Sequence, residues 1–205
     1  MPDYKLTYFD IDGARAEPIR IAFHAAGIPF EDNRISFTEF GEQRTGIRFT
    51  AVPVMEIDGA QVTQSNALSR YVGKLADLYP ADPLQALYCD EAMGAMEDLI
   101  HYIVQTFGLE GEALIAARKK LVEGRMTVFL KGLEELLIRG GGEYFADNQL
   151  TIADLKVFTQ TRSLCSGRLD HIPEDIVQQL APALLEHEKR IGADKRVIAY
   201  YSSRT

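Results

Sequence analysis

The chain has 205 residues, of which 46% are hydrophobic and 25% are charged, and this composition is typical of a globular protein of one or two domains. A formal net charge of −8 argues against nucleic acid as a partner, because binding phosphates requires an excess of lysine and arginine. No segment approaches the roughly 18 consecutive apolar residues of a membrane span, so we expect no membrane partner either.

The N-terminal part of the chain alternates short strands with helices. Alternating apolar residues predict a strand over 5–9, and the apolar periodicity of 16–26 predicts a helix that Gly27 ends. A second strand is predicted over 30–35, followed by a short helix over 40–44. This order predicts a small mixed sheet with helices on its faces.

Residues 51–66 carry the strongest local signal. Asp58-Gly59 separates two short strand patterns, and this dipeptide is a strong indicator of a β-hairpin. Pro53 precedes the first strand, where it removes no ladder hydrogen bond and where a cis Val52–Pro53 bond would suit a sharp entry. Ser65 is the predicted N-cap of a helix over 66–75. A helix N-terminus beside an extended edge suits an anionic, peptide-like ligand.

After a proline- and aspartate-rich segment at 76–84, the strand patterns stop. Helical periodicity predicts long helices over 84–107 and 112–138, and the glycines at 140–142 supply a left-handed cap for the second. We therefore predict three parts, a βα domain, a linker and an all-helical domain, which span residues 1–77, 78–83 and 84–205.

Another helix start is marked by Thr151, with Asp154 three residues later forming a capping box and Leu150 available as a hydrophobic staple. Shorter helices are predicted near 175–180 and 182–191.

The chain has two cysteines, Cys89 and Cys165, and they lie in separate helical patterns. This excludes a disulfide framework and a Cys-x-x-Cys motif, and it favours buried helix residues over nucleophiles. The opening residues lead directly into a strand pattern without a signal or transit peptide. We therefore expect a cytoplasmic protein.

Together these motifs resemble the cytosolic glutathione transferases, most closely the sigma class, which includes the haematopoietic-type prostaglandin D synthases. The resemblance covers essentially the whole chain in order and is carried by six segments: 4–9, 13–20, 52–53, 56–59, 64–65 and 151–154. It implies a thioredoxin-like α/β N-terminal domain and an all-α C-terminal domain. It also implies a homodimer with a role in detoxification, with glutathione as co-substrate and no permanently bound cofactor.

The resemblance places the catalytic hydroxyl at Tyr8, at the end of the first strand. A free thiol has a pKa of about 8.5, and lowering it by about two units requires roughly 2.7 kcal/mol of thiolate stabilisation. One hydrogen bond to a charged group contributes about 1.5–3 kcal/mol, so a single hydroxyl could supply most of the shift. Arg15 resembles a sigma-class arginine that adds a second donor or orients Tyr8. The loop Gly13-Ala14-Arg15 has one residue more than the family's Gly-Arg pattern, which puts the shape of this loop in doubt.

The remaining glutathione-binding residues are also implied by the resemblance. Gln64 and Ser65 would hold the γ-glutamyl end, and Val52, with Pro53 after it, would pair its backbone with the cysteinyl amide. Arg44 would contact the glycyl carboxylate. Asp98 matches an acidic residue that reaches the ligand amine of a neighbouring subunit, although a solvated surface charge remains open.

Two departures from the family concern glutathione contacts. Phe40 stands where the class usually has a ligand-contacting tryptophan, and the chain has no tryptophan at all. Ala51 stands where a lysine often precedes the proline dipeptide. We therefore expect two contacts to glutathione to be missing or replaced.

The acceptor side is expected to be lined by six residues: Phe9, Arg15, Leu99, Gln105, Lys156 and Gln160. Lys156 and Gln160 are four residues apart and share one helix face. Several of these positions are polar where prostaglandin synthases tend to be aromatic or apolar, which favours conjugation of polar electrophiles over isomerisation.

Other chemistries find little support in the sequence. The four histidines show no metal-ligand spacing, and no Gly-x-Ser-x-Gly motif of a serine hydrolase is present. The leading hypothesis is addition of the glutathione thiolate to small electrophiles. A glutathione-dependent isomerase or peroxidase and a non-catalytic scaffold of the same fold remain the alternatives. The natural acceptor and the use of a related thiol stay open.

Overall fold

The computed structural model of the protein describes residues 2–204 and divides them into two compact units. The first comprises 2–79 together with 195–204, and the second comprises 80–194. The predicted α/β and all-α organisation is confirmed. The predicted domain limits differ at the C-terminal end, where 195–204 was assigned to the helical domain. These residues form an unpredicted helix, α10 (Lys195–Ser202), which packs against the first helix of the chain.

The first unit is built on a four-stranded mixed sheet with the order β2-β1-β3-β4. Its strands are β1 (Tyr4–Phe9), β2 (Glu31–Ile35), β3 (Val54–Ile57) and β4 (Ala60–Thr63). β1 pairs with β2 in parallel and with β3 antiparallel, and β3 pairs with β4 as a hairpin. β1 therefore occupies an interior position with a partner on each side.

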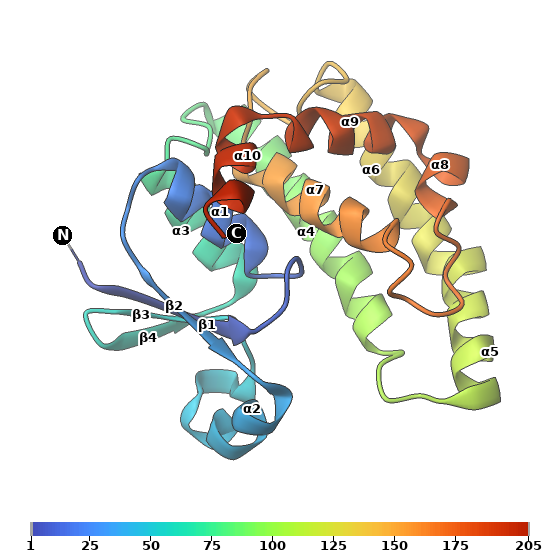
Figure 1. The fold of residues 1–205 in the computed structure, drawn as a ribbon. Coiled ribbons are helices and arrows are strands. Elements are labelled where there is room, and N and C mark those ends of the chain that lie inside the picture. Colours follow the sequence, from blue (N-terminus) through green and yellow to red (C-terminus); the bar gives the residue numbers. More distant parts are fainter. Residues whose placement is uncertain (1, 205) are drawn as a thin grey trace. The chain divides into compact units, whose positions relative to one another are not determined.

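Two helices, α1 (Glu17–Ala25) and α3 (Ser65–Leu75), lie side by side over one face of this sheet (Figure 1). Their apolar faces form the core with Leu6 and Met55, all of which are fully buried. The parallel connection from β1 to β2 passes through α1, as a βαβ crossover requires.

α2 (Phe37–Gln43) begins three residues earlier than the predicted helix. Ser36 accepts a hydrogen bond from the Glu39 amide, and the Glu39 carboxylate accepts one from the Ser36 amide in return. This reciprocal cap explains the earlier start. Two short 3₁₀ turns, η1 (Arg44–Gly46) and η2 (Arg48–Thr50), lead from α2 to the hairpin.

The predicted hairpin is confirmed. Asp58 and Gly59 have φ values of 50° and 81°, and two successive positive φ values are the requirement of the tight turn that matches the strand twist. The Val52–Pro53 peptide bond is cis, as expected. The predicted N-cap was wrong by one residue, because the N-cap of α3 is Gln64 and Ser65 is the first helical residue.

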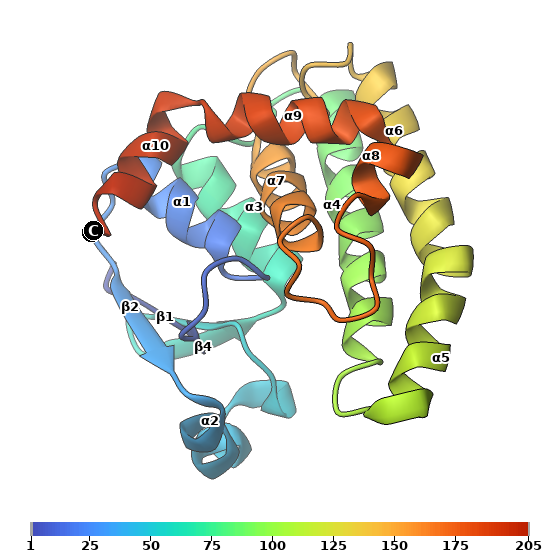
Figure 2. The same ribbon diagram turned by 45° about the vertical axis from the view of Figure 1, so that its right-hand side comes forward.

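The second unit contains six α-helices among its described residues: α4 (Pro83–Val104), α5 (Gly111–Leu121), α6 (Thr127–Arg139), α7 (Ile152–Leu164), α8 (Ile176–Leu180) and α9 (Pro182–Gly192). A π-helical turn, η3 (Val122–Met126), joins α5 to α6, so the predicted helix over 112–138 is one long helix interrupted by this turn. α7 contacts both α4 and α9 (Figure 2), and its residues 152–161 are all buried. None of the helices within 2–204 is long and apolar enough to cross a bilayer.

The predicted glycine cap at the end of α6 is confirmed, since Gly141 and Gly142 have φ values of 102° and 85°. The Gly142 amide donates to the Leu137 carbonyl at 2.9 Å, which satisfies one of the last carbonyls of the helix. Gly140 is needed for another reason, because a Cβ atom there would stand 2.3 Å from the Tyr144 carbonyl oxygen.

The predicted capping box at the start of α7 is present and belongs to a larger buried network. One Asp154 carboxylate oxygen accepts hydrogen bonds from the amide and hydroxyl of Thr151, at 2.8 and 2.6 Å. The other accepts from the Phe145 amide at 3.0 Å and pairs with His187 Nε2 at 2.9 Å. Asp154 and His187 are both fully buried. One carboxylate thus connects the start of α7, the segment before it and α9.

We predict that Asp154→Ala lowers the free energy of unfolding by about 3–5 kcal/mol, because it leaves several buried donors without an acceptor. Urea unfolding monitored by circular dichroism measures this change. Glu186→Ala is the control, because Glu186 forms only an exposed pair with Lys189 and its loss should cost less than about 1 kcal/mol. Equal destabilisation by the two substitutions would contradict the role of the network.

Candidate active site

Tyr8 lies at the end of β1, in the register position opposite Arg34 of β2. The pairing of β1 with β3 stops one residue earlier, at Thr7, so Tyr8 stands where the sheet opens on that side. The Tyr8 side chain is 4% exposed, and its ring packs against that of Phe9 with the centroids 5.3 Å apart. The structure therefore holds the predicted catalytic tyrosine in a fixed position.

Three predicted site residues continue from Tyr8 through ring contacts. The Phe9 centroid lies 5.3 Å from that of Phe40, which it meets edge to face. The Arg44 guanidinium lies 5.6 Å from the Phe40 centroid. Phe37, which the sequence did not single out, also contacts Phe9 at 4.4 Å although it is 71% exposed. Phe40 thus presents a ring face between Phe9 and Arg44 and has no indole N–H to donate.

Arg44 is exposed, and no ion pair or hydrogen bond joins its side chain to another residue within 2–204. A free guanidinium next to an aromatic face suits a carboxylate, which it can bind through two parallel hydrogen bonds. Its placement is compatible with the predicted contact to the glycyl carboxylate.

The loop that carries the additional residue turns sharply before α1. Gly13 and Ala14 have φ values of 101° and 57°, so the chain passes through two successive left-handed residues. A left-handed alanine costs roughly 1–2 kcal/mol, since its Cβ crowds the following carbonyl. Arg15 follows in this turn and is half-buried. The loop therefore passes through two left-handed positions directly before Arg15.

Val52 presents open backbone groups at the entrance to the hairpin. It lies before β3, and its N–H and C=O form no hydrogen bond with any other residue of the described chain. Pro53 is buried. An extended segment with unpaired polar groups is suited to pair with the backbone of a peptide, as in strand addition.

Gln64 has φ 75° and ψ 105°, a conformation that non-glycine residues rarely adopt. Its side chain is exposed, whereas Ser65 is 8% exposed at the first turn of α3. The turn at Gln64 directs the chain from β4 into α3 and brings the N–H groups at the start of the helix next to the hairpin. Backbone strain of this kind is concentrated at functional sites.

The remaining predicted residues lie in the second unit. Asp98 is exposed on α4, whereas Leu99 beside it is fully buried. Gln105 is exposed just beyond α4, and its amide nitrogen lies 2.9 Å from His101 Nε2.

Lys156 and Gln160 lie on α7 and are 1% and 8% exposed. The Lys156 ammonium lies 2.5 Å from the Glu97 carboxylate, so this charge already has a partner within the helical unit. The Gln160 amide nitrogen is buried without a hydrogen-bond partner in the described chain. Of the polar acceptor residues on α7, Gln160 is the one with unused hydrogen-bonding capacity.

The two cysteines are not activated. Burial raises the pKa of the Cys89 thiol to about 12, and burial also raises the pKa of Cys165. No cluster of three or more histidine, cysteine, aspartate or glutamate side chains in the described chain could hold a metal ion.

Arg20 is a residue of this region that the sequence analysis missed. It lies in α1 between Ile19 and Ile21 and is fully buried, with its guanidinium 5.9 Å from the Tyr8 ring centroid. An arginine within an apolar run, three residues after a glutamate, was the available signal of a buried ion pair.

Comparison with known proteins decides the family. The model for the glutathione S-transferase N-terminal domain matches residues 4–74, and that for the C-terminal domain matches 97–204. The chain belongs to the glutathione S-transferase family. The family predicted from the sequence motifs is therefore confirmed.

Individual relatives agree with this assignment. Glutathione S-transferase 1 of Ascaris suum is 32% identical over 205 residues, covering 97% of each chain. Hematopoietic prostaglandin D synthase of Gallus gallus is 28% identical over 204 residues, covering 100% of this chain and 98% of the relative. The solved structure of a Fasciola hepatica sigma class transferase superposes with a TM-score of 0.84 at 25% identity, covering 100% and 97% of the two chains. Both kinds of protein anticipated from the sequence are thus among the relatives.

The strained turn at Gln64 leads to a stability prediction. Gln64→Gly should be more stable than Gln64→Ala by about 1 kcal/mol, because glycine adopts the positive φ without steric cost while both variants lose the same side-chain groups. Urea unfolding of the two variants measures the difference. An alanine variant as stable as the glycine variant would show that this backbone conformation carries no strain.

Proposed function

We propose that the protein adds the glutathione thiolate to small electrophiles and that Tyr8 activates the thiol. The observation that carries this proposal is the combination found within the first unit. A buried tyrosine lies one residue before the end of β1, an open backbone segment at Val52 precedes β3 of the same sheet, and the N-terminus of α3 follows β4. The family assignment gives this combination its chemical meaning.

The residue roles follow from the chemistry of glutathione. We propose that Gln64 and Ser65 hold the γ-glutamyl carboxylate at the positive end of α3, where helix N–H groups favour an anion. Val52 would pair with the cysteinyl amide, and Arg44, stacked on Phe40, would bind the glycyl carboxylate. Arg15 would assist Tyr8 from the reshaped loop. Within the first unit, the acceptor would contact Phe9 and Arg15.

A second candidate is a glutathione-dependent isomerase or peroxidase that uses the same thiolate on another acceptor. The whole-length similarity to a protein named hematopoietic prostaglandin D synthase favours its consideration. The burial of Lys156 against Glu97 removes one polar group that we had counted against an apolar acceptor. Comparing turnover of a generic chloronitrobenzene with that of a prostaglandin endoperoxide would distinguish these activities, and a scaffold protein would turn over neither.

We predict that Tyr8→Phe retains glutathione binding and lowers kcat by about ten- to a hundredfold, because it deletes one hydrogen bond to a thiolate without emptying the ring's space. The pKa of the bound thiol should rise toward the free value of about 8.5. Thiolate absorbance titrated with pH, together with chloronitrobenzene conjugation, measures both.

Tyr4→Phe is the matched control for this prediction. It deletes a hydroxyl on the same strand, but the Tyr4 hydroxyl is bonded to that of Tyr71 and has no assigned part in the reaction. This variant should keep native turnover. Unchanged turnover and thiol pKa in Tyr8→Phe would contradict the role of Tyr8.

We also propose that the protein acts as a cytoplasmic homodimer with a part in detoxification. α4 exposes Leu84 and Leu87, which are 51% and 60% exposed, and α6 exposes Val128 and Ile138, both 61% exposed. α4 and α6 pack against each other, so these apolar side chains belong to one pair of helices. Exposed apolar groups on neighbouring helices are suited to contact a second copy. Asp98 continues the helical spacing of Leu84 and Leu87 along α4, which would let it reach a ligand across such an interface.

We expect sedimentation to show a dimer and Asp98→Asn to weaken glutathione affinity more than it lowers kcat, because the carboxylate would pair with the ligand amine in both the ground state and the transition state. Asp175→Asn is a suitable control, since Asp175 is an exposed aspartate beside α8 that only accepts from Gln179. A stable, active monomer at the assay concentration would overturn this part of the proposal.

A further inference from the structure

The buried guanidinium of Arg20 holds the backbone that follows Tyr8. Its nitrogens donate to the Phe9 carbonyl at 3.5 Å and to the Ile11 carbonyl at 3.2 Å. Phe9 is the residue directly after Tyr8 and the last of β1, and Ile11 lies in the loop that carries Arg15. The same guanidinium lies 5.9 Å from the Tyr8 ring centroid. Arg20 therefore contacts both the ring of Tyr8 and the strand end that orients it.

Two carboxylates fix Arg20 in this position. Asp32 of β2 accepts from its Nε at 2.9 Å, and Glu17 of α1 accepts from a terminal nitrogen at 3.2 Å. The side chains of Arg20 and Glu17 are both completely buried. A buried ion pair holds its geometry only when the remaining oxygen atoms also find donors.

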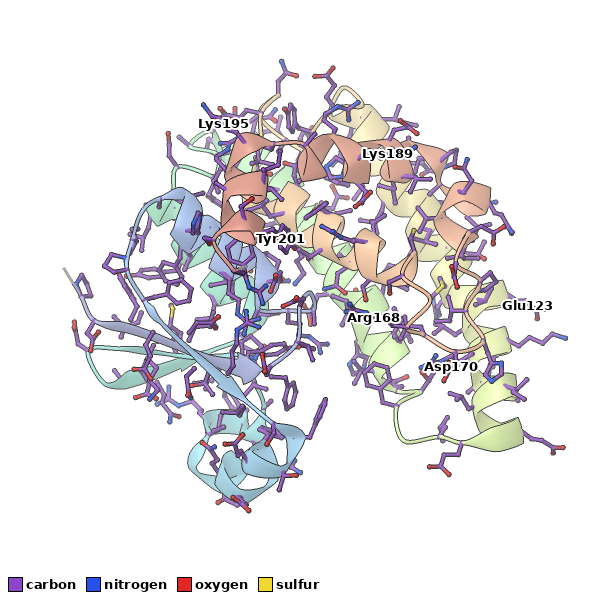
Figure 3. The ribbon with its side chains drawn as sticks, in the orientation of Figure 1. Glu123, Arg168, Asp170, Lys189, Lys195 and Tyr201 are labelled. Atoms are coloured by element: carbon purple, nitrogen blue, oxygen red, sulfur yellow. The ribbon has the colours of Figure 1, made fainter. Side chains whose placement is uncertain are left out.

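α10 and the residue Arg204 after it supply those donors to Glu17. The second carboxylate oxygen of Glu17 accepts hydrogen bonds from the Tyr200 hydroxyl at 3.2 Å and from Arg204 at 3.1 Å. Arg204 also donates to the Tyr200 hydroxyl and to the Asp12 carboxylate. Tyr200 lies on α10, next to Tyr201 (Figure 3), and Arg204 follows the end of this helix. A continuous network of hydrogen bonds thus runs from Arg204 and Tyr200 through Glu17 to Arg20.

The surroundings of Tyr200 and Asp12 shift the pKa of both groups. Burial, followed by the charge of Glu17, raises the pKa of Tyr200, so its hydroxyl remains a neutral donor. Burial alone would raise the pKa of Asp12, but hydrogen bonding to Arg204 leaves it below its usual value. Arg34 of β2 completes the cluster through pairs with Asp10, Asp12 and Asp32.

We propose that Arg20 is a positioning residue for Tyr8, and that Tyr200 and Arg204 act through Glu17 to hold it, so that α10 and the residues after it tune the activation of the glutathione thiol. This inference rests on the proposed function. None of the four residues is among those assigned to glutathione or acceptor binding. Weakening this series of hydrogen bonds should therefore change the alignment of the Tyr8 hydroxyl and leave the contacts that bind glutathione and the acceptor in place.

Replacing Arg20 or Glu17 would leave an unpaired buried charge and endanger folding, so the test uses the distal residues. Tyr200→Phe deletes one hydroxyl, and Arg204→Met removes a guanidinium whose side chain is 26% exposed. Lys189→Met is the control, because Lys189 lies on α9 (Figure 3) in an exposed pair with Glu186, outside the chain of hydrogen bonds. Circular dichroism establishes that each variant is folded.

The readouts are the pKa of the bound glutathione thiol, from thiolate absorbance, and the pH profile of kcat with a chloronitrobenzene. We expect each distal variant to raise the pKa of the bound thiol by about half a unit. At an assay pH below that pKa, the smaller thiolate fraction should lower kcat about threefold. Activity should return toward the native level at higher pH, and KM for glutathione should stay within about twofold of the native value. The Lys189 variant should match the native protein throughout.

An unchanged thiol pKa in both distal variants overturns the inference, and so does an activity loss that is equal at every pH, because a merely structural defect lowers the active fraction uniformly. The native protein separates this failure from that of the proposed function. If native protein forms no thiolate from bound glutathione, the proposed function fails and this inference fails with it. If native protein forms the thiolate and the variants keep its pKa, only this inference is overturned.

Discussion

The interior position of β1 is the constraint on which the first unit depends. A strand paired on both sides cannot slip by one residue without turning its buried side chains toward the opposite face. Parallel pairing with β2 requires the α1 crossover, and antiparallel pairing with β3 brings the cis-proline hairpin alongside. The pairing of β1 with β3 ends at Thr7, one residue before Tyr8. The sheet thus fixes the position of the tyrosine.

Buried carboxylates hold together the helices in both units. In the second unit, Asp154 joins the start of α7 to α9 through His187. In the first unit, Glu17 joins α1 to α10 through Tyr200 and Arg204. A buried carboxylate is costly unless every oxygen finds donors, so each one specifies which segments must come together. Segments far apart in the sequence are thereby held at one point.

The proposed site combines rigid and strained elements. Tyr8 lies on a strand held on both sides, whereas Gln64 and Ala14 occupy conformations that cost free energy. Such costs are tolerated when the surrounding structure determines the local geometry, and here the hairpin and the two helices do so. The turns at these residues direct the chain from β4 into α3 and from β1 toward α1.

The sequence by itself determined the elements whose signals are local. The Asp58-Gly59 turn, the capping box of Thr151 and Asp154 and the glycines after α6 were predicted because each depends on the conformational preferences of a few adjacent residues. The order of these motifs along the chain was also sufficient to predict the family, which the comparisons confirm.

Only the tertiary structure decided how distant residues are paired. Arg20 lies within the helix predicted over 16–26, but the sequence did not indicate its pair with Asp32. It also did not indicate that Tyr200 and Arg204 donate to Glu17, which lies up to 187 residues away in the chain. α10 was missed, and the N-cap of α3 was placed one residue late. Lys156 was expected to meet a ligand but pairs with Glu97 of another helix. Ion pairs across elements leave no periodic trace in a sequence, since they depend on which faces pack together, and packing is decided by the whole fold.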